Sequence, residues 1–476
     1  MRRKRKTSRP ETTAVDRISE CPDSVLVHIL SLLEEIEDAV RTQVLSKRWR
    51  FLWTLLPSLV FRYTAIDDYG GEGEGYGVAR NSVFVAFVGK TLFSSDCKLR
   101  KFEVDFHYEP RFASNVDSWT RFVTGKAVEE LYLLLLPELG EEGLYELPQL
   151  LYDNYWFKEL HFSCCRVIPR GNVAWYSLKK LSIGYVKFSD DVIERILAGC
   201  PVLETLELHN CEGFSHLAVT NSCMKKLILR DFLDIWDDSG LEISAPYLLS
   251  LEMSGVLGKR CRFTNISSLV DAVFNCHFAC FEQDRANDYE RIQNIVVVFL
   301  ASLLHVKNLT LGTWAIEVLS IMEAKGLSSP LLNCECLTLD TKIDKYVLPG
   351  IANVFKSTPN VEALIMTWSF SSPELYGIES TMLLNYDEER YWTSQKWTYK
   401  CLVLHLKNVT ISDCLMKYNC ESNFFSFIQF LLRNARVLQK MVISTPSDAR
   451  LKEYFEAAKK LLSFPRSSPD AAVIFC

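Results

Sequence analysis

The most constraining feature of this sequence is a short pattern that returns about a dozen times between Leu99 and Leu404. Each copy has one apolar residue, two variable residues, and then two apolar residues separated by one, as in LRKFEV at Leu99 and LETLEL at Leu203. Most copies begin 21 to 29 residues after the previous one, and later gaps reach 37 and 38 residues. The alternating end suits a strand with one buried face, and this period predicts strands stacked in one parallel sheet.

On such strands, the residues beside the buried apolar pair point to the open face of the sheet. The side chains that we expect to form a candidate target-binding face are Tyr132, His161, Glu207, His209, Lys226 and Arg230. Their charges are of both signs, which favours protein recognition over a uniform nucleic-acid track. The alternative for any one of them is a solvated strand residue with no binding role.

Length and composition limit the classes of protein that this chain can belong to. With 476 residues, 48% of them hydrophobic and 24% charged, it predicts two or three folded domains or one elongated repeat array. The net charge is −6, and the first ten residues carry six cations and no anion, so the remainder carries −6 − 6 = −12. A global nucleic-acid surface is therefore disfavoured.

The same composition bears on the cellular compartment. No apolar core follows the basic start of the chain, so no secretory signal is expected, and the longest apolar run, Ile295 to Leu304, is about half of a membrane span. The sixteen cysteines then favour reduced thiols over a disulfide framework. We expect the nucleus, the cytoplasm or both, with no membrane association.

Residues Asp16 to about Val60 are dense in Leu, Val and Ile at helical spacing. Pro22 predicts the first turn of a helix, and Ser46 is a candidate N-cap for a short helix that carries Trp49. Some 45 residues cannot bury this much apolar surface by themselves. A partner or a neighbouring domain must cover part of it.

The segment DRISECPDSVLVHILSLLEEIEDAVRTQVLSKRWRFLW resembles a plant F-box, with departures at Cys21 and at Glu34 to Glu37. This resemblance implies that the segment binds a Skp-family adaptor. By family match, the adaptor contacts are expected at Pro22, Leu26, Ile29, Leu30, Val40, Leu45 and Trp49. Some of these seven, Leu26 and Leu45 first among them, are equally open to being core residues of the segment itself.

Two later regions extend the resemblance. SDDVIERILAGCPVLETLEL (Ser189 to Leu208) is similar to the leucine-rich repeats of plant F-box proteins, and YKCLVLHLKNVTI followed by CESNFFSFIQFLLRNARVLQKMVIS resembles the FBD domain that follows such repeats. The implied fold is α/β: a small helical F-box, an irregular solenoid with a curved parallel sheet and helices on its convex side, and an FBD cap.

The expected boundaries are a disordered basic tail at 1–15, the F-box at 16–62, a linker with the first solenoid elements at 63–97, repeats at 98–375, the FBD domain at 376–455 and a C-terminal tail at 456–476. The Gly-rich stretch Asp67 to Gly77 is expected to be a flexible loop.

A search for chemical motifs finds no nucleophile elbow and no phosphate-binding loop. The nearest metal-like groupings are Cys276, His277 and Cys280, then Cys334 and Cys336, and the pair Cys164 and Cys165. None has a second pair of ligands at zinc-finger spacing, which favours buried or strand thiols. We expect no enzyme activity, no metal and no cofactor.

The resemblance implies a substrate-recognition subunit of an SCF-type cullin-RING ubiquitin ligase. Its F-box would dock on a Skp-family adaptor, and through it on a cullin and a RING protein, while the repeats hold an unknown target protein. The alternative is a nuclear nucleic-acid-binding or regulatory protein that acts without a ligase, using Arg2 to Lys6 and the SKRWR segment. The basic tail itself fits either a nuclear-import signal or a solvated end.

Overall fold

A computed structural model of the chain describes residues 18, 20–63, 74–137, 143–232, 240–257, 261–278, 285–367, 384–394, 397–412, 421–444 and 458–475. The basic tail expected at 1–15 lies outside them. The chain divides into two compact units, Met1–Cys164 and Cys165–Cys476. None of the helices in the described part is both long enough and apolar enough to cross a membrane.

The first unit begins with a helical module, residues 20–62. Its helical segments are α1 (Asp23–Ser31), α2 (Ile36–Arg41), the 3₁₀ helix η1 (Thr42–Val44) and the 3₁₀ helix η2 (Trp49–Leu55). Pro22 occupies the N-cap of α1, next to the predicted first turn. Ser46 does not cap the Trp49 helix as predicted, because η2 starts after Arg48 and has no side-chain cap. Strand β1 (Ser58–Arg62) ends the module.

The rest of the first unit adds the first repeats. Its elements are α3 (Glu74–Phe93), β2 (Lys101–Tyr108), η4 (Pro110–Phe112), α4 (Ala113–Gly125), β3 (Glu130–Pro137), β4 (Tyr145–Glu146), α5 (Gln149–Tyr152) and β5 (Glu159–Ser163). Strands β1, β2, β3 and β5 pair in parallel in that order. Part of the stretch predicted as a loop is helical, because α3 begins at Glu74, and residues 64–73 lie outside the described residues.

The second unit is built on one parallel sheet. Its strands, in spatial order, are β7 (Lys180–Gly184), β8 (Thr205–His209), β10 (Lys226–Phe232), β12 (Ser250–Leu257), β14 (Asp271–Phe278), β15 (Asn308–Gly312), β16 (Cys336–Asp340), β17 (Ala363–Thr367), β18 (Asn408–Ile411), β19 (Lys440–Ile443) and β20 (Ala472–Phe475). The other strands of this unit are β6 (Cys165–Arg166) and a second parallel sheet of β9 (His216–Ala218), β11 (Leu241–Ser244) and β13 (Cys261–Thr264).

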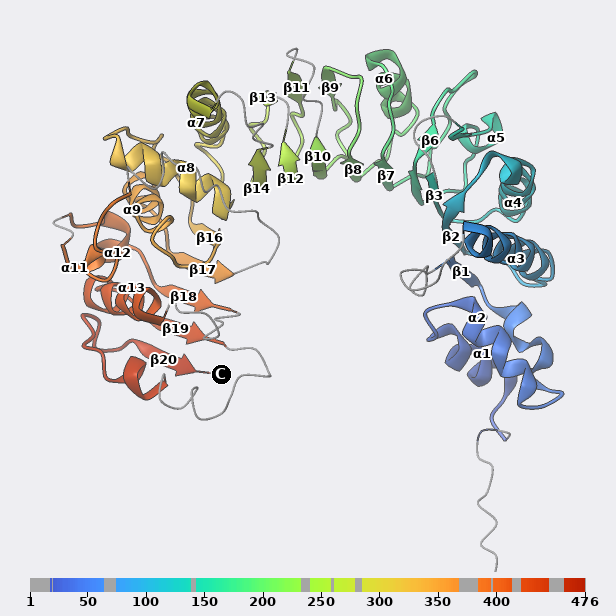
Figure 1. Cartoon of the computed structure of the whole chain (residues 1–476), viewed down its shortest axis with the longest axis horizontal. Helices are drawn as coiled ribbons and strands as arrows, with labels where there is room; N and C mark the ends of the chain where they lie inside the picture. Colours follow the sequence, from blue (N-terminus) through green and yellow to red (C-terminus); the bar gives the residue numbers. More distant parts are fainter. Residues whose placement is uncertain are drawn as a thin grey trace, which may run out of the picture. The chain divides into compact units, whose positions relative to one another are not determined.

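The helices of the second unit lie on one side of its long sheet, the outer side in Figure 1. They are α6 (Asp190–Ala198), α7 (Arg285–Ser302), α8 (Thr313–Ala324), α9 (Leu348–Ser357), α11 (Tyr391–Ser394), α12 (Lys400–Leu404) and α13 (Glu421–Asn434). The other face of the sheet, here called the open face, carries no helix within the described residues. The predicted α/β repeat fold with a parallel sheet and helices on one side is confirmed.

The repeat pattern sets the register between strands. Leu206, Leu227 and Leu251 face one another on β8, β10 and β12, and all three are buried. The motif therefore aligns its apolar pair from strand to strand, and this alignment forms the core.

The C-terminal region departs from the prediction in two places. YKCLVL does not form a strand: it contributes α12, and the alternating buried pair is instead Val409 and Ile411 of β18, which lie opposite Leu364 and Met366 of β17. The predicted helix and the strand after it are α13 and β19. Residues 456–476 are not simply a tail, since β20 pairs with β19 and continues the sheet.

Candidate docking surfaces

The helical module exposes an unusual amount of apolar side chain. The large hydrophobic residues exposed between positions 18 and 55 are Ile18, Val25, Ile29, Leu32, Leu33, Val44, Leu45, Phe51 and Leu55. Val44 is 84% exposed, and Leu32 is 71% exposed. Large exposed apolar side chains that gather on a soluble protein mark an interaction site, so this segment is a candidate docking surface. The nine residues are referred to below as the module's apolar surface.

The structure divides the seven predicted adaptor contacts into two groups. Pro22, Ile29 and Leu45 are exposed, and Val40 is half-buried. Leu26, Leu30 and Trp49 are at most 6% exposed, so they form the module's core. Their burial supports the core alternative raised above for Leu26 and counts against direct adaptor contacts. Leu45, for which the same alternative was raised, is exposed.

The reason for this division is helical spacing. Leu26 and Leu30 are four residues apart and lie on the same face of α1, which packs toward η2, where Trp49 begins the helix. Val25 and Ile29 of α1 and Leu32 at its C-cap follow the same helical spacing on a neighbouring face and stay exposed. The apolar face of α1 is wider than the surface that the rest of the module covers, so part of this face stays exposed.

The module's cations have different environments. Arg48 donates hydrogen bonds to the carboxylate of Asp23 and to the backbone carbonyl of Cys21, which ties the segment before η2 to the start of α1. Arg41 pairs with acidic residues of its own helix. Lys47 and Arg50 are exposed beside the apolar surface. Arg48 is thus a structural clamp, and the two exposed cations are available to a partner.

In the first unit, Tyr132 of β3 and His161 of β5 lie on neighbouring strands with their rings stacked and their centroids 5.8 Å apart. The Tyr132 hydroxyl donates to Glu159 at 2.8 Å, and the Lys101 ammonium lies 4.4 Å from the centre of the Tyr132 ring. Burial, followed by the Glu159 carboxylate, raises the pKa of Tyr132. The two residues predicted from sequence therefore come together as one half-buried cluster.

Glu103 extends this cluster and was not among the predicted face residues. Its carboxylate accepts hydrogen bonds from the Arg62 guanidinium and lies 2.8 Å from the Lys101 ammonium, and its side chain is 8% exposed. Burial would raise the pKa of Glu103, but the hydrogen bonds from Lys101 and Arg62 prevail and lower it. The two cationic neighbours, Arg62 and Lys101, therefore stabilise the ionised form of the Glu103 carboxylate.

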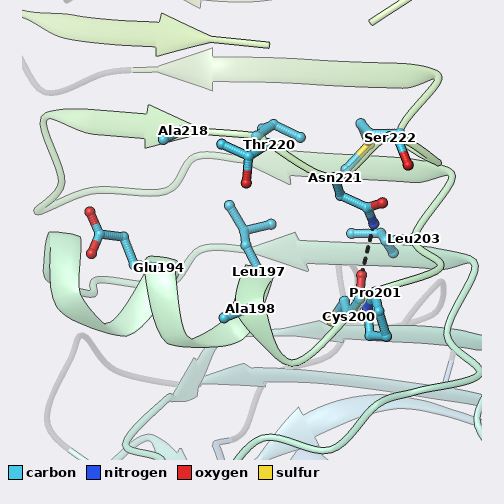
Figure 2. Close-up of a pocket in the computed structure, with 12 residues that line it drawn as sticks. Glu194, Leu197, Ala198, Cys200, Pro201, Leu203, Ala218, Thr220, Asn221 and Ser222 are labelled. Carbon is cyan, nitrogen blue, oxygen red and sulfur yellow. Dashed lines mark hydrogen bonds between the residues drawn. The ribbon is translucent and has the colours of Figure 1, made fainter. Parts of the chain in front are cut away.

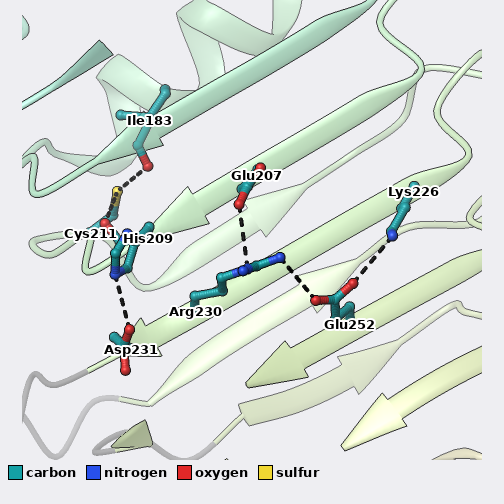
Figure 3. A network of polar contacts seen from close by, with 8 residues as sticks. All are labelled: Ile183, Glu207, His209, Cys211, Lys226, Arg230, Asp231 and Glu252. Atoms are coloured by element: carbon teal, nitrogen blue, oxygen red, sulfur yellow. Dashed lines mark hydrogen bonds and ion pairs between the residues drawn. The ribbon is translucent and has the colours of Figure 1, made fainter. Parts of the chain in front are cut away.

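The second unit carries another polar network on its open face (Figure 3). Arg230 of β10 lies between Glu207 of β8, at 3.4 Å, and Glu252 of β12, at 3.1 Å. Lys226 reaches the same Glu252 at 3.2 Å. The predicted residues Glu207, Lys226 and Arg230 are therefore brought together, and their charges balance each other across three strands.

His209 belongs to a neighbouring cluster at the ends of the strands. Its Nε2 lies 3.0 Å from an Asp231 carboxylate oxygen (Figure 3). The ring of Tyr185 packs against the His209 ring with a centroid separation of 4.7 Å. Asp231 also accepts a hydrogen bond from the backbone N–H of Val256. Sequence reasoning missed Asp231 and Tyr185 because they follow the alternating part of the motif.

A periodic signal for these two residues does exist. Tyr185, Asn210, Asp231 and Gly255 all have positive φ and follow one another at intervals of 25, 21 and 24 residues, which match the motif spacings. The backbone N–H of Tyr185 and of Asn210 donates to the next strand. A residue with positive φ thus recurs once per repeat, just after the alternating part of the motif.

The cysteines that the structure describes are free thiols, most of them buried. Cys276 and Cys334 are buried, and burial raises the pKa of the Cys334 thiol to about 12, which keeps it protonated. Cys280 lies outside the described residues. Among the residues that are described, no group of three His, Cys, Asp or Glu side chains is placed to hold a metal ion, and the twelve cysteines are free thiols.

Together, the parallel repeat sheet and the helices before it define a leucine-rich-repeat protein with an N-terminal helical module. A family model described as "At1g61320/AtMIF1, LRR domain" matches residues 94–450. The chain belongs to the plant F-box/leucine-rich-repeat family. The matched domain runs through the boundary expected at 376, in agreement with the continuous pairing of β17, β18 and β19.

Relatives from Arabidopsis thaliana cover most of the chain. Putative F-box protein At1g49610 is 34% identical over 361 residues, which are 74% of this chain and 84% of that protein. F-box/LRR-repeat protein At5g02910 is 32% identical over 443 residues, 90% of this chain and 88% of that protein. F-box/LRR-repeat protein At3g03360 is 28% identical over 481 residues, 97% of this chain and 91% of that protein. The similarity therefore spans the helical module as well as the repeats.

Proposed function

We propose that this chain is the substrate-recognition subunit of an SCF-type cullin-RING ubiquitin ligase, with a non-catalytic role. The observation that carries the proposal is the module's apolar surface, nine exposed large side chains within residues 18–55. The names of the relatives, F-box and F-box/LRR-repeat proteins, support the same role.

In this proposal, the apolar surface docks on a Skp-family adaptor. The contacts come from the exposed residues of the predicted set, Pro22, Ile29 and Leu45, joined by Val44 and Phe51. An exposed aromatic ring such as Phe51 is a good interface anchor. Lys47 and Arg50 at the rim would meet acidic groups and speed association more than they add affinity.

The target protein binds elsewhere, on the open face of the sheets. The Glu207, Lys226, Arg230 and Glu252 network is balanced in charge, which suits a target of mixed charge and disfavours a polyanion such as nucleic acid. The cullin and the RING protein are reached through the adaptor, in the nucleus, the cytoplasm or both. No step of this role needs a cofactor.

The test is co-purification of the full chain with a Skp-family adaptor. Val44→Asp with Leu45→Asp should weaken adaptor binding at least tenfold, because a charge is placed in a dehydrated contact. Leu331→Asp is the matched control, since Leu331 is 69% exposed in the second unit. Adaptor binding by the double variant at the wild-type affinity would show that this surface is not the docking site.

A second measurement separates the adaptor role from catalysis. In a reconstituted ubiquitination reaction, the chain should form no adduct with ubiquitin that reducing agent removes, because a receptor only positions its target. Appearance of such an adduct would overturn the non-catalytic role.

The nucleic-acid alternative has less support from the charges. Arg48 is committed to Asp23 and to the Cys21 carbonyl, so the SKRWR segment has fewer cations available than its sequence indicates. A DNA affinity that falls with salt with a slope of several units would favour this alternative.

A further inference from the structure

A groove with a volume of about 560 Å³ lies on the helix side of the second unit, between α6 and the chain that follows β9 (Figure 2). It forms where one repeat places a helix on the sheet and the next places only the short strand β9. Small side chains line both of its walls, Ala198 on α6 and Ala218 on β9 (Figure 2). A bulky helix is therefore followed by a thin strand, and the space between them stays open.

The two walls of the groove are held together at both ends. At one end, the Asp190 carboxylate accepts hydrogen bonds from the backbone N–H groups of Ser215 and His216 and from the Ser215 hydroxyl. At the other end, the Asn221 side chain donates to the Cys200 carbonyl at 2.9 Å (Figure 2). The walls are thus fixed before any ligand arrives, which reduces the ordering cost of binding.

Helix α6 is also fixed against the repeat before it. Gly199 approaches Val173 so closely that a Cβ on the glycine would lie 2.5 Å from the Val173 carbonyl oxygen. The Arg195 guanidinium donates to the Gly171 carbonyl at 2.6 Å. Neither wall can therefore move to close the groove without breaking these contacts.

The groove is apolar in its floor and acidic at one end. Val219, Leu203 and Met224 are buried beneath it, and Leu197 of α6 is half-buried on its side. Glu194 stands at one end and is exposed, while the small polar residues of the turn after β9 lie toward the other (Figure 2). Within the described part of the chain, Glu194 has no ion-pair partner.

We infer that this groove is a second docking site, for a peptide segment of another protein that places a Lys or Arg beside an aliphatic side chain. The aliphatic side chain covers Leu197 and Val219, and the cation pairs with the Glu194 carboxylate. Charge decides the chemistry of the occupant: an acidic segment would be repelled by the exposed Glu194 carboxylate at the end of the groove. This site lies on the helix side of the sheet and does not depend on docking at the helical module.

The test selects a random library of 12-residue peptides, displayed on phage, on the full-length chain. A parallel selection uses Ala218→Phe, which fills the groove, since a phenylalanine on an exposed strand position is well tolerated. The expected result is a pool that binds the wild-type chain but not the Ala218→Phe chain. Its sequences should be enriched in Lys or Arg within two positions of Leu, Ile, Val or Met.

The role of charge is tested by variants of α6. For a synthetic peptide from the pool, fluorescence polarisation should show affinity weakened about threefold by Glu194→Gln and about tenfold by Glu194→Lys, as expected for a solvent-exposed ion pair lost or reversed. Asp191→Lys, with the same change of net charge on the same helix, should change affinity less than twofold. Selection on Glu194→Lys should shift the pool toward Asp and Glu.

Three outcomes would overturn the inference. The first is a pool with no dependence on Ala218→Phe, and the second is a groove-dependent pool without enrichment of cations. The third is a much larger pool after deletion of residues 1–10, which would identify the chain's own basic segment as the occupant. Thermal unfolding of each variant, monitored by circular dichroism, separates a lost groove from a lost fold.

Discussion

The side chain of Asp231 fills the space that a side chain on Gly255 would need. A Cβ built on Gly255 would lie 2.1 Å from the Asp231 Oδ1 atom, and Gly255 has φ +77°. The same Oδ1 accepts the backbone N–H of Val256 at 2.9 Å, and the other carboxylate oxygen faces His209. Glycine is therefore required at position 255 for two reasons: its backbone has positive φ, and the Asp231 carboxylate leaves no room for a Cβ atom. These contacts link three neighbouring strands, β8, β10 and β12.

Replacement of Gly255 by alanine should destabilise the second unit by about 2 to 4 kcal/mol, from the left-handed backbone and the displaced carboxylate together. Gly326→Ala is the matched control, because Gly326 has φ +71° but no atom within 4 Å of its Cβ position. It should cost only about 1 kcal/mol. Urea denaturation measures both, and equal costs would contradict the role of Asp231.

Two helical glycines should respond to alanine in opposite directions. A Cβ on Gly350 of α9 would lie 2.0 Å from the Ile316 carbonyl oxygen of α8, so Gly350→Ala should force the two helices apart and cost about 2 kcal/mol or more. Gly125, at the end of α4, has open space, and Gly125→Ala should stabilise by about 0.5 kcal/mol. Thermal unfolding checks the signs, and a stabilising Gly350→Ala would contradict the close helix packing.

We expect Glu103 to make an acid-sensitive contribution to the folding stability of the first unit. Its folded-state pKa is lowered by Lys101 and Arg62, so its stabilisation is full above the ordinary pKa of about 4.3 and is lost as pH falls through the lower folded-state value. Glu103→Gln should cost about 1 to 3 kcal/mol at pH 7, since it leaves two cations without a counter-charge. That cost should shrink below about pH 4.

Hydrogen exchange of β1 and β2 as a function of pH measures this contribution. Glu335→Gln serves as a control, because Glu335 forms an exposed pair with Lys307 and should contribute less than about 0.5 kcal/mol. If Glu103→Gln destabilised the first unit more at low pH than at pH 7, the pKa of Glu103 would be raised by folding, which contradicts this prediction.

The helical module offers a test of core against surface. Trp49→Ala should destabilise the module by about 3 to 5 kcal/mol, because Trp49 is only 6% exposed. Leu45→Ala, at a side chain 64% exposed, should leave stability within about 0.5 kcal/mol while it weakens adaptor binding. Hydrogen exchange in α1 and adaptor affinity, measured on both variants, distinguish the two roles. Full protection of α1 in Trp49→Ala would place Trp49 outside the core.

Much of this fold could be predicted because its signals are local. The motif of Leu203 to Leu208 indicates which residues of a strand are buried. The alternation of side chains along a strand then places Glu207 and Arg230 on the open face. It failed at Leu404, which is 54% exposed, because the apolar alternation that pairs with β17 comes from Val409 and Ile411 further along. The stretches around Leu404 and around Val409 both have the alternating apolar pattern. Which of them forms the strand depends on pairing with β17, which the sequence pattern does not show.

The sequence by itself determined the class of this protein: a repeating parallel sheet with an apolar helical module, recognisable from spacing and motif. Tertiary structure decided which apolar residues of the module are buried, because Leu26 and Ile29 are both large aliphatic residues of α1, a helix that contacts η2, and only Leu26 is buried. It also decided that Asp231 meets Gly255 and His209, residues 22 to 24 positions away. Such contacts depend on strand register, which is a property of neighbours in space rather than in sequence.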